Sequence, residues 1–426
     1  MRTWVRAAVP LGVAVACTLP GIYLGATGAH IAPPVAAALY GIAVVGAAFV
    51  LGWVAEAIQV DISAGLAITV LALIAVLPEY AVDFVFAWEG GHAFATDGPA
   101  CSAGSCGLAL ANMTGANRIL VGIGWAAVVL LAAWRTRKGG SRTVTLERTD
   151  AVPLAFLALA TVYSLTLPLR HSVTIVDTTV LVAIFVLYAV RVAKAPAGDP
   201  DLAGVAELIG RQPRQRRRLT CTALFAFSAM VILLVAENFA HALVETGEKL
   251  GVSRFLLVQW VAPVASEAPE LLVACLFAWR LKTTDALATL VSSKVNQWTL
   301  LVGTLPVVFA VAAGSTAGLP LDAAQRDELL LTAAQSLFAV TLLVSLSITV
   351  RAALVLLGLF VAQFVLAAVL PDSVRGVEVI ALSVAYLLGA IVVGVRSRAH
   401  VRTLLRDGFR TSYRDLARSG PDVRGQ

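Results

Sequence analysis

The sequence predicts an all-α polytopic membrane protein of about twelve transmembrane helices, with two inverted five-helix repeats and broken helices at the bilayer midplane. Three observations predict this fold. Hydrophobic residues make up 59% of the 426 residues, charged residues only 14%, and mean hydropathy is +0.86. Long apolar windows follow one another along the chain, and a Pro-Glu motif occurs in each half. A soluble domain carries about 25% charged residues, so we expect lipid to be the solvent of this chain.

Windows of roughly 20 apolar residues mark transmembrane helices. Twelve windows occur, at residues 6–27, 35–57, 62–88, 108–134, 151–168, 172–194, 219–243, 253–279, 286–314, 329–349, 352–371 and 377–396. The connections at 135–150 and 191–218 are rich in Arg and Lys, whereas the loop at 89–107 contains neither. The positive-inside rule therefore predicts cytoplasmic termini and a multi-pass protein of the cell (plasma or inner) membrane. Basic residues confined to such loops do not predict a nucleic-acid partner.

The predicted organisation has six segments. They are an additional N-terminal helix at 1–34, a first repeat half at 35–194, a cytoplasmic basic linker at 195–218, a second repeat half at 219–371, an additional C-terminal helix at 372–396 and a cytoplasmic basic tail at 397–426. A solvated connector is the expectation for the linker, with an amphipathic helix over 202–209 as the alternative. No soluble catalytic domain is expected, and the protein is predicted not to be an enzyme.

The repeat is carried by two aligned segments. Residues 77–88 match residues 268–279 in Pro, Glu, Val, Phe, Ala and Trp at a constant offset. Counting spans places the two segments in opposite directions across the membrane, as in transporters whose site lies at the midplane between inverted repeats. Proline frees a backbone carbonyl four residues earlier, and lipid tolerates such a break only where protein or a wet cavity covers it. Broken helices are therefore predicted at Pro78 and Pro269, with a packing kink as the alternative.

Four acidic residues lie within predicted spans: Glu79, Asp83, Glu267 and Glu270. A carboxylate at a helix centre costs about 2.5–3.5 kcal/mol on insertion scales. Each pair shares one helix face, because its members are four or three residues apart. The four carboxyl groups are therefore expected to hold cations, protons or basic partners. Glu79 and Glu270 are predicted to face each other within reach of one cation.

Two basic residues, Lys294 and Arg118, lie in the spans that follow the acidic ones. An unpaired cation at this depth is costly, so both are predicted to point towards Asp83, Glu267 or another buried acid.

Clustered carboxyl groups in a low dielectric favour proton binding near neutral pH, which predicts a proton-coupled process. The polar stretches at 111–117 and 292–298 offer neutral oxygen ligands or, alternatively, interhelical contacts.

These residues resemble the two alpha repeats of the sodium/calcium exchanger (calcium/cation antiporter) family. The family's repeats typically read Thr-Ser-x-Pro-Glu and, one helix later, Gly-Asn-x-x-Gly-Ser-Asn. Pro78-Glu79 and residues 266–270 match the first element, and residues 111–117 match the second. The chain departs from the family at Ala75-Val76, which replaces Thr-Ser, and at Ser293-Lys294, so it would be a divergent member.

The resemblance implies that Glu79 and Glu270 are the central, metal-binding carboxylates and that Asn112 is a neutral ligand. The full predicted cation-binding set is Glu79, Glu270, Asn112, Asp83, Glu267, Ser266 and Ser293, with Lys294 and Arg118 compensating charge and Pro78, Pro269, Asn117 and Asn296 in support.

The predicted function is a secondary-active antiporter that exchanges Ca²⁺ or Na⁺ for H⁺ or Na⁺ and needs no cofactor besides the transported cation. Its partners would be inorganic cations and the lipid bilayer. The alternatives are a Na⁺/H⁺ antiporter without Ca²⁺ transport and a degenerate, non-transporting member. An intramembrane enzyme is disfavoured because no HExxH or GxSxG motif occurs. Cys101 and Cys106 share one polar loop, and the sequence leaves open whether they pair.

Overall fold

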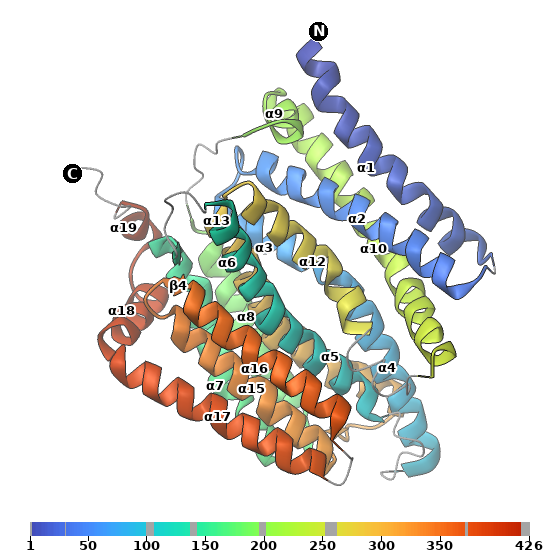
Figure 1. The fold of residues 1–426 in the computed structure, drawn as a ribbon, viewed down its shortest axis with the longest axis vertical. Helices are drawn as coiled ribbons and strands as arrows, with labels where there is room; N and C mark the ends of the chain where they lie inside the picture. The colour runs from blue at the N-terminus through green and yellow to red at the C-terminus, as the bar shows by residue number, and fades with distance from the viewer. Residues whose placement is uncertain are drawn as a thin grey trace.

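The protein is a bundle of long helices. The structure, a computed structural model, describes residues 2–29, 31–98, 106–136, 143–195, 202–251, 262–370 and 374–418. Within these ranges, nine helices are long and apolar enough to cross a membrane. The start of α1 (Arg2–Thr27) and the C-terminal helix α19 (Tyr413–Arg418) lie at the same end of the bundle (Figure 1).

The helices of the first half overlap the predicted apolar windows, but the window at 62–88 is divided between two helices and α4 extends to Asp97, into the predicted loop. In chain order the elements are α1, α2 Pro33–Ile58, α3 Ala64–Ala75, α4 Leu77–Asp97, α5 Leu108–Ile119, η3 Leu120–Trp125, α6 Ala126–Arg135, β1 Thr143–Thr145, η4 Arg148–Asp150, α7 Ala151–Ser164, η5 Leu167–Leu169, β2 Ser172–Val173 and α8 Ile175–Val192.

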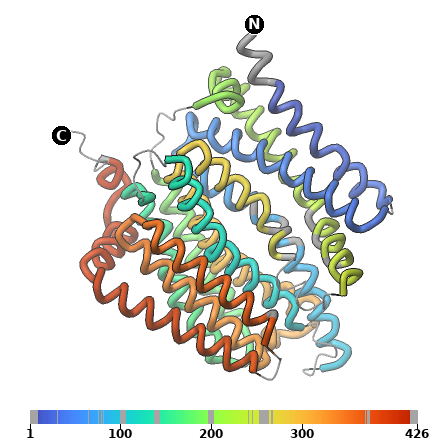
Figure 2. The backbone as a smooth tube through the Cα atoms, viewed as in Figure 1, coloured from blue at the N-terminus to red at the C-terminus, as the bar shows by residue number. Residues whose placement is uncertain are grey.

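The second half is built in the same way. Its elements are α9 Val205–Gly210, α10 Arg214–Lys249, α12 Ala262–Trp279, α13 Thr283–Asn296, η7 Gln297–Leu301, α14 Val302–Ala313, β3 Leu319–Pro320, α15 Ala323–Leu343, β4 Ser347–Thr349, α16 Val350–Val369, α17 Arg375–Arg396, α18 Arg398–Phe409 and α19. Figure 2 shows α1, α2 and α10 together at one side and α15 to α18, in orange and red, at the other. Helix α12 contacts α2 on one flank and α5 and α13 on the other.

The two Pro-Glu motifs behave differently. Helices α3 and α4 are separated at Val76, and Pro78 lies in the first turn of α4. The break predicted at the first motif is therefore present. Helix α12, in contrast, runs through Pro269 without interruption, so the break predicted there is wrong. A proline inside a helix removes one backbone hydrogen bond, and α12 packs against α2, α5, α6 and α13, which hold it as one helix.

An irregularity that was not predicted occurs in the span after each acidic helix. A π-helical turn, η3, follows α5, and a second one, η7, follows α13. Such a turn adds one residue to the local backbone ring and is frequent at functional sites. In this chain η3 begins shortly after the polar stretch at 111–117, and η7 begins within the polar stretch at 292–298.

Parts of the linker and the tail are folded. Helix α9 buries Val205, Ala206 and Ile209 in a cluster with residues of α2 and α10, so this part of the linker is the predicted alternative, a helix, and not a solvated connector. Helix α18 packs against α7. Their approach is so close that a Cβ atom on Gly408 would lie 2.2 Å from Ala155 Cβ.

Two short antiparallel strand pairs join loops of the two halves. Strand β1 pairs with β4, with Val144 opposite Ile348, and β2 pairs with β3, with Val173 opposite Leu319. Each pair therefore connects a loop beside α7 to a loop beside α15.

Candidate cation site

The four predicted acidic residues are buried in the bundle. Glu79 and Asp83 project from α4, and Glu267 and Glu270 project from α12. Each of them is at most 1% exposed. The first two are four residues apart and the second two are three apart, so each pair lies on one face of its helix, as predicted.

The amide of Gln297 joins the two acidic helices. Its Nε2 atom donates hydrogen bonds to Glu79 Oε2 at 2.8 Å and to Glu267 Oε1 at 2.5 Å. The Glu267 carboxyl also contacts that of Glu270, and Ser293 lies beside Glu270. Gln297, the first residue of η7, brings the carboxyl groups of α4 and α12 into one cluster. The sequence prediction did not include Gln297, although it lies in the polar stretch at 292–298.

Asp83 and Asn112 form the neighbouring part of the cluster. Asn112 Nδ2 donates to Asp83 Oδ1 at 2.8 Å, and both side chains are fully buried. The side-chain oxygen of Asn112 has no hydrogen-bond partner among the described residues. Asn296, predicted as a supporting residue, accepts a hydrogen bond at 2.9 Å from the Tyr80 hydroxyl. The side chains of Ser266 and Pro78 lie outside the part of the chain that the structure describes.

Several buried oxygens of this cluster accept no hydrogen bond from the residues that the structure describes. They are Glu79 Oε1, Asp83 Oδ2, Glu267 Oε2 and both carboxyl oxygens of Glu270. Unpartnered buried oxygens are costly, and they are the ligand atoms that hard cations such as Ca²⁺ and Na⁺ prefer. Within the described ranges, no three His, Cys, Asp or Glu side chains are arranged to hold a metal ion. A cation here would therefore also need neutral oxygens, such as that of Asn112.

Lys294 forms its hydrogen bonds with Asn117 of α5. Its ammonium group donates to the backbone carbonyl of Asn117 at 2.7 Å and to Asn117 Oδ1 at 2.6 Å. The same group lies 5.6 Å from the centre of the Trp298 ring. Glu267 and Glu79 act on it electrostatically, but its hydrogen bonds go to an amide. Lys294 therefore lies within electrostatic reach of two acids of the cluster while its hydrogen bonds attach it to α5.

Arg118 pairs with an acid outside the cluster. Its guanidinium forms an ion pair with Glu328 of α15, and its Nε donates to the Thr114 carbonyl at 3.2 Å. Arg118 is fully buried, whereas the Glu328 side chain is 17% exposed. The expectation that Arg118 meets an acid is confirmed, but the acid is neither Asp83 nor Glu267. Arg118 therefore joins α5 to α15.

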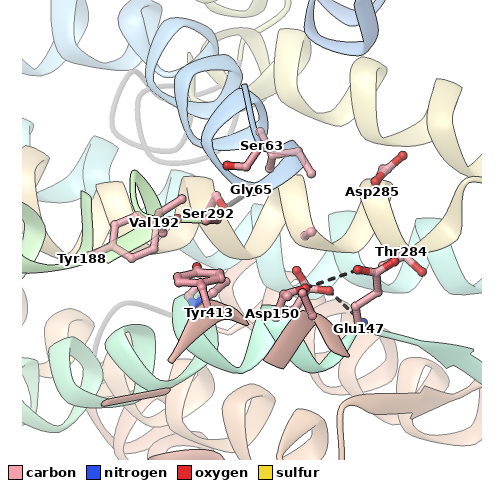
Figure 3. A pocket seen from close by; sticks show the side chains of 16 residues that line it. Ser63, Gly65, Glu147, Asp150, Tyr188, Val192, Thr284, Asp285, Ser292 and Tyr413 are labelled. Carbon is pink, nitrogen blue, oxygen red and sulfur yellow. Dashed lines mark hydrogen bonds between the residues drawn. The ribbon is translucent and has the colours of Figure 1, made fainter. Parts of the chain in front are cut away.

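A cavity of about 290 Å³ lies at the end of the bundle near α19. Figure 3 shows Tyr188 and Ser292 at one side of it and Glu147, Thr284 and Asp285 at the other. Asp150 and Tyr413 also line this cavity. Ser292 precedes Ser293, so the cavity approaches the residue that lies beside Glu270.

The structure gives the bonding state of four of the five cysteines. Cys106 is disulfide-bonded, while Cys17, Cys221 and Cys275 are free. Cys101, the partner considered for Cys106, lies outside the described residues.

The fold and the site define a multi-pass membrane protein with a buried acidic cluster, an arrangement typical of ion transporters. The sequence pattern of the family described as sodium/calcium exchanger protein matches residues 33–194 and 220–369. The chain belongs to this family, which confirms the resemblance seen in the sequence.

Solved structures agree with this assignment. The chain is 36% identical to the H⁺/Ca²⁺ exchanger CAX, with a TM-score of 0.82, over 95% of this chain and 99% of that one. Two structures of the sodium-calcium exchanger NCX_Mj share the fold. One, soaked with Na⁺, is 16% identical with a TM-score of 0.54 over 85% of this chain and 100% of that one. The other, soaked with Na⁺ and Sr²⁺, is 15% identical with a TM-score of 0.56 over 82% of this chain and 99% of that one. Among curated proteins, none matches the chain significantly.

Proposed function

We propose that the protein is a secondary-active cation antiporter that exchanges Ca²⁺ or Na⁺ for H⁺ or Na⁺ through the carboxyl groups of α4 and α12. One observation carries the proposal: Gln297 joins Glu79 and Glu267 in a buried cluster whose remaining oxygens have no hydrogen-bond partner within the described part of the chain. The family and the similarity to an H⁺/Ca²⁺ exchanger support Ca²⁺ and H⁺ as the ion pair.

The chemistry of the cluster suits a cation and protons that compete for the same oxygens. Glu79 and Glu270 would bind the cation, Asn112 would supply a neutral oxygen, and Asp83 and Glu267 would complete the acidic surround. When no cation is bound, several carboxylates would remain uncompensated in a low dielectric, and protons are the simplest way to neutralise them. Cation and proton binding are then mutually exclusive, which is the requirement for antiport.

Charge balance sets the expected coupling. The sequence suggested that Arg118 compensates the charge of the cluster. Because Arg118 forms an ion pair with Glu328, we count it outside the charge balance of the cluster. If the net charge of the buried cluster is to stay constant, one divalent cation must replace two protons, and one Na⁺ must replace one. Exchange of Ca²⁺ for H⁺ would then be electroneutral and insensitive to membrane potential.

Ion flux in proteoliposomes tests the proposal. Purified protein is reconstituted with an internal pH dye, and Ca²⁺ or Na⁺ gradients are imposed with the membrane potential clamped. Ca²⁺ uptake should move protons outwards at the same rate at every potential. Glu79→Gln and Glu270→Gln should abolish exchange, because a neutral amide offers the cation no negative charge and cannot take up or release a proton. Asp83→Asn and Glu267→Gln should shift the pH dependence of exchange.

Glu378→Gln provides the matched control, since Glu378 is a buried carboxyl on α17 outside the cluster. It should exchange like the unchanged protein. Cation movement without any pH change or pH dependence would refute the proton half of the proposal. Na⁺-driven proton movement without Ca²⁺ transport would identify a Na⁺/H⁺ antiporter, and binding without flux would identify a non-transporting member.

A further inference from the structure

A buried tyrosine lies in the wall of the cavity and is hydrogen-bonded to α13, the helix that also carries Ser293. Tyr188 of α8 lines the cavity, yet only 1% of it is exposed. Its hydroxyl forms hydrogen bonds with Thr69 Oγ1 of α3 at 3.0 Å and with Ser292 Oγ of α13 at 3.1 Å. One hydroxyl thus ties together three helices, one of which leads into the acidic helix α4.

The layer between cavity and cluster is thin. Ser292 lines the cavity and meets Tyr188, whereas the next residue, Ser293, is fully buried beside Glu270. Consecutive residues of a helix point about 100° apart, so α13 presents one serine to each side. Helix α13 therefore links the cavity wall, through Ser292 and its hydrogen bond to Tyr188, with the carboxyl cluster, through Ser293.

The cavity is suited to a hydrated cation. Glu147, Asp150 and Asp285 line it, and no basic side chain does so among the residues that the structure describes around it. Ionised carboxylates in a lining with low-dielectric walls raise the local concentration of cations. The lining thus favours cations in the cavity that Tyr188 lines.

The aromatic ring of Tyr188 is fixed independently of its hydroxyl. It packs against Phe156 of α7 at 5.7 Å and against Phe185 at 6.2 Å between ring centres. Removing the hydroxyl alone therefore leaves the ring in place and breaks only the two hydrogen bonds to α3 and α13.

We propose that Tyr188 is a positioning residue that closes the inner end of the cavity and must release Ser292 for an ion to pass between the cavity and the carboxyl cluster. The inference rests on the proposed antiport and assigns the cavity as the aqueous approach for its cation. Nothing in the antiport proposal itself requires Tyr188, so the two are tested by different readouts.

Cysteine accessibility tests the barrier without measuring transport. In a background with alanine at Cys17, Cys221 and Cys275, Ala288→Cys reports on the cavity and Ser293→Cys on the far side of Tyr188. A membrane-impermeant cationic methanethiosulfonate is added to sealed vesicles at the side that modifies Ala288→Cys. With Tyr188 present, Ser293→Cys should react much more slowly than Ala288→Cys.

Adding Tyr188→Phe should raise the modification rate of Ser293→Cys by about tenfold, the change that about 1.4 kcal/mol produces, and leave that of Ala288→Cys unchanged. Tyr386 of α17 is also fully buried, so Tyr386→Phe is the control and should change the modification rate of neither cysteine.

The proposed barrier is refuted if Ser293→Cys reacts as fast as Ala288→Cys in the protein that retains Tyr188. It is also refuted if Tyr188→Phe leaves the modification rate of Ser293→Cys unchanged, or if Tyr386→Phe raises that rate as much as Tyr188→Phe does. Loss of flux with the accessibility pattern intact would instead count against the antiport proposal alone.

Discussion

Lys294 holds Asn117 by two hydrogen bonds, one to its backbone carbonyl at 2.7 Å and one to its side-chain oxygen at 2.6 Å. The two residues come from α13 and α5, one from each half of the chain, and both are buried. The lysine therefore satisfies the oxygens of an amide that would otherwise be free to bind a cation.

Lys294→Met should destabilise the protein. It keeps an apolar side chain of similar length but leaves Asn117 Oδ1 buried without a donor, which costs about 1–3 kcal/mol. Thermal unfolding in detergent should show a lower midpoint. Lys294→Gln retains a hydrogen-bond donor, so its unfolding midpoint should fall less. Equal decreases of the midpoint in the two variants would contradict a hydrogen-bonding role for Lys294.

Gln297→Ala should weaken cation binding. The change removes the donor shared by Glu79 and Glu267, and a hydrogen bond to a charged group contributes about 1.5–3 kcal/mol. The apparent Kd, measured by calorimetry, should rise by about tenfold or more. Gln363→Ala, at a buried glutamine of α16, is the matched control and should bind normally.

Arg118→Met should be among the most destabilising single changes. It leaves Glu328 without its buried partner, and breaking a buried ion pair costs about 3–5 kcal/mol. Glu328 retains some access to water, which favours the lower end of that range. The double variant Arg118→Met with Glu328→Leu should recover much of the loss. A double-mutant cycle of unfolding free energies measures the coupling, and strict additivity would argue against the pair.

The docking of α18 should depend on pH through Asp407. The Arg148 guanidinium bonds to Asp407 at 2.7 Å and holds the pKa of that carboxyl below its usual range. The ionised form therefore stabilises docking above the unfolded pKa of about 3.9, and this contribution is lost as pH falls through the lower folded pKa. A nitroxide at the exposed residue Arg402 should stay immobile through neutral pH and become mobile only on strong acidification.

Asp407→Asn should make the same nitroxide mobile at neutral pH, because the charge that attracts Arg148 is gone. Arg414→Gln, at an exposed position of α19, serves as the control and should leave the label immobile. Unchanged mobility in Asp407→Asn would mean that α18 is held by its apolar contacts alone.

The sequence predicts the helices and the buried acids well, because both follow from local properties. Apolar windows place the helices, and the high cost of a carboxylate in lipid means that Glu79, Asp83, Glu267 and Glu270 must be enclosed. The partners of the bases depend instead on contacts between distant segments. Arg118 meets an acid 210 positions away, and no periodicity encodes that distance.

Other features escaped the sequence for related reasons. Proline usually interrupts a helix, but the neighbours of Pro269 keep α12 continuous. The π-turns η3 and η7 have no composition of their own. Tyr188 lies in an unremarkable apolar run, and only the fold brings its hydroxyl to Thr69 and Ser292.

The two short strand pairs constrain how the halves of the chain can move. One pair lies before α7 and the other after it, and each binds a loop of the second half through backbone hydrogen bonds. The segments at both ends of α7 are thereby paired with the segments that precede and follow α15. Separating α7 from the second half would break both strand pairs and leave their backbone groups unpaired. We therefore expect α7 and α15 to move as one rigid body, while helices without such strand pairs move relative to them.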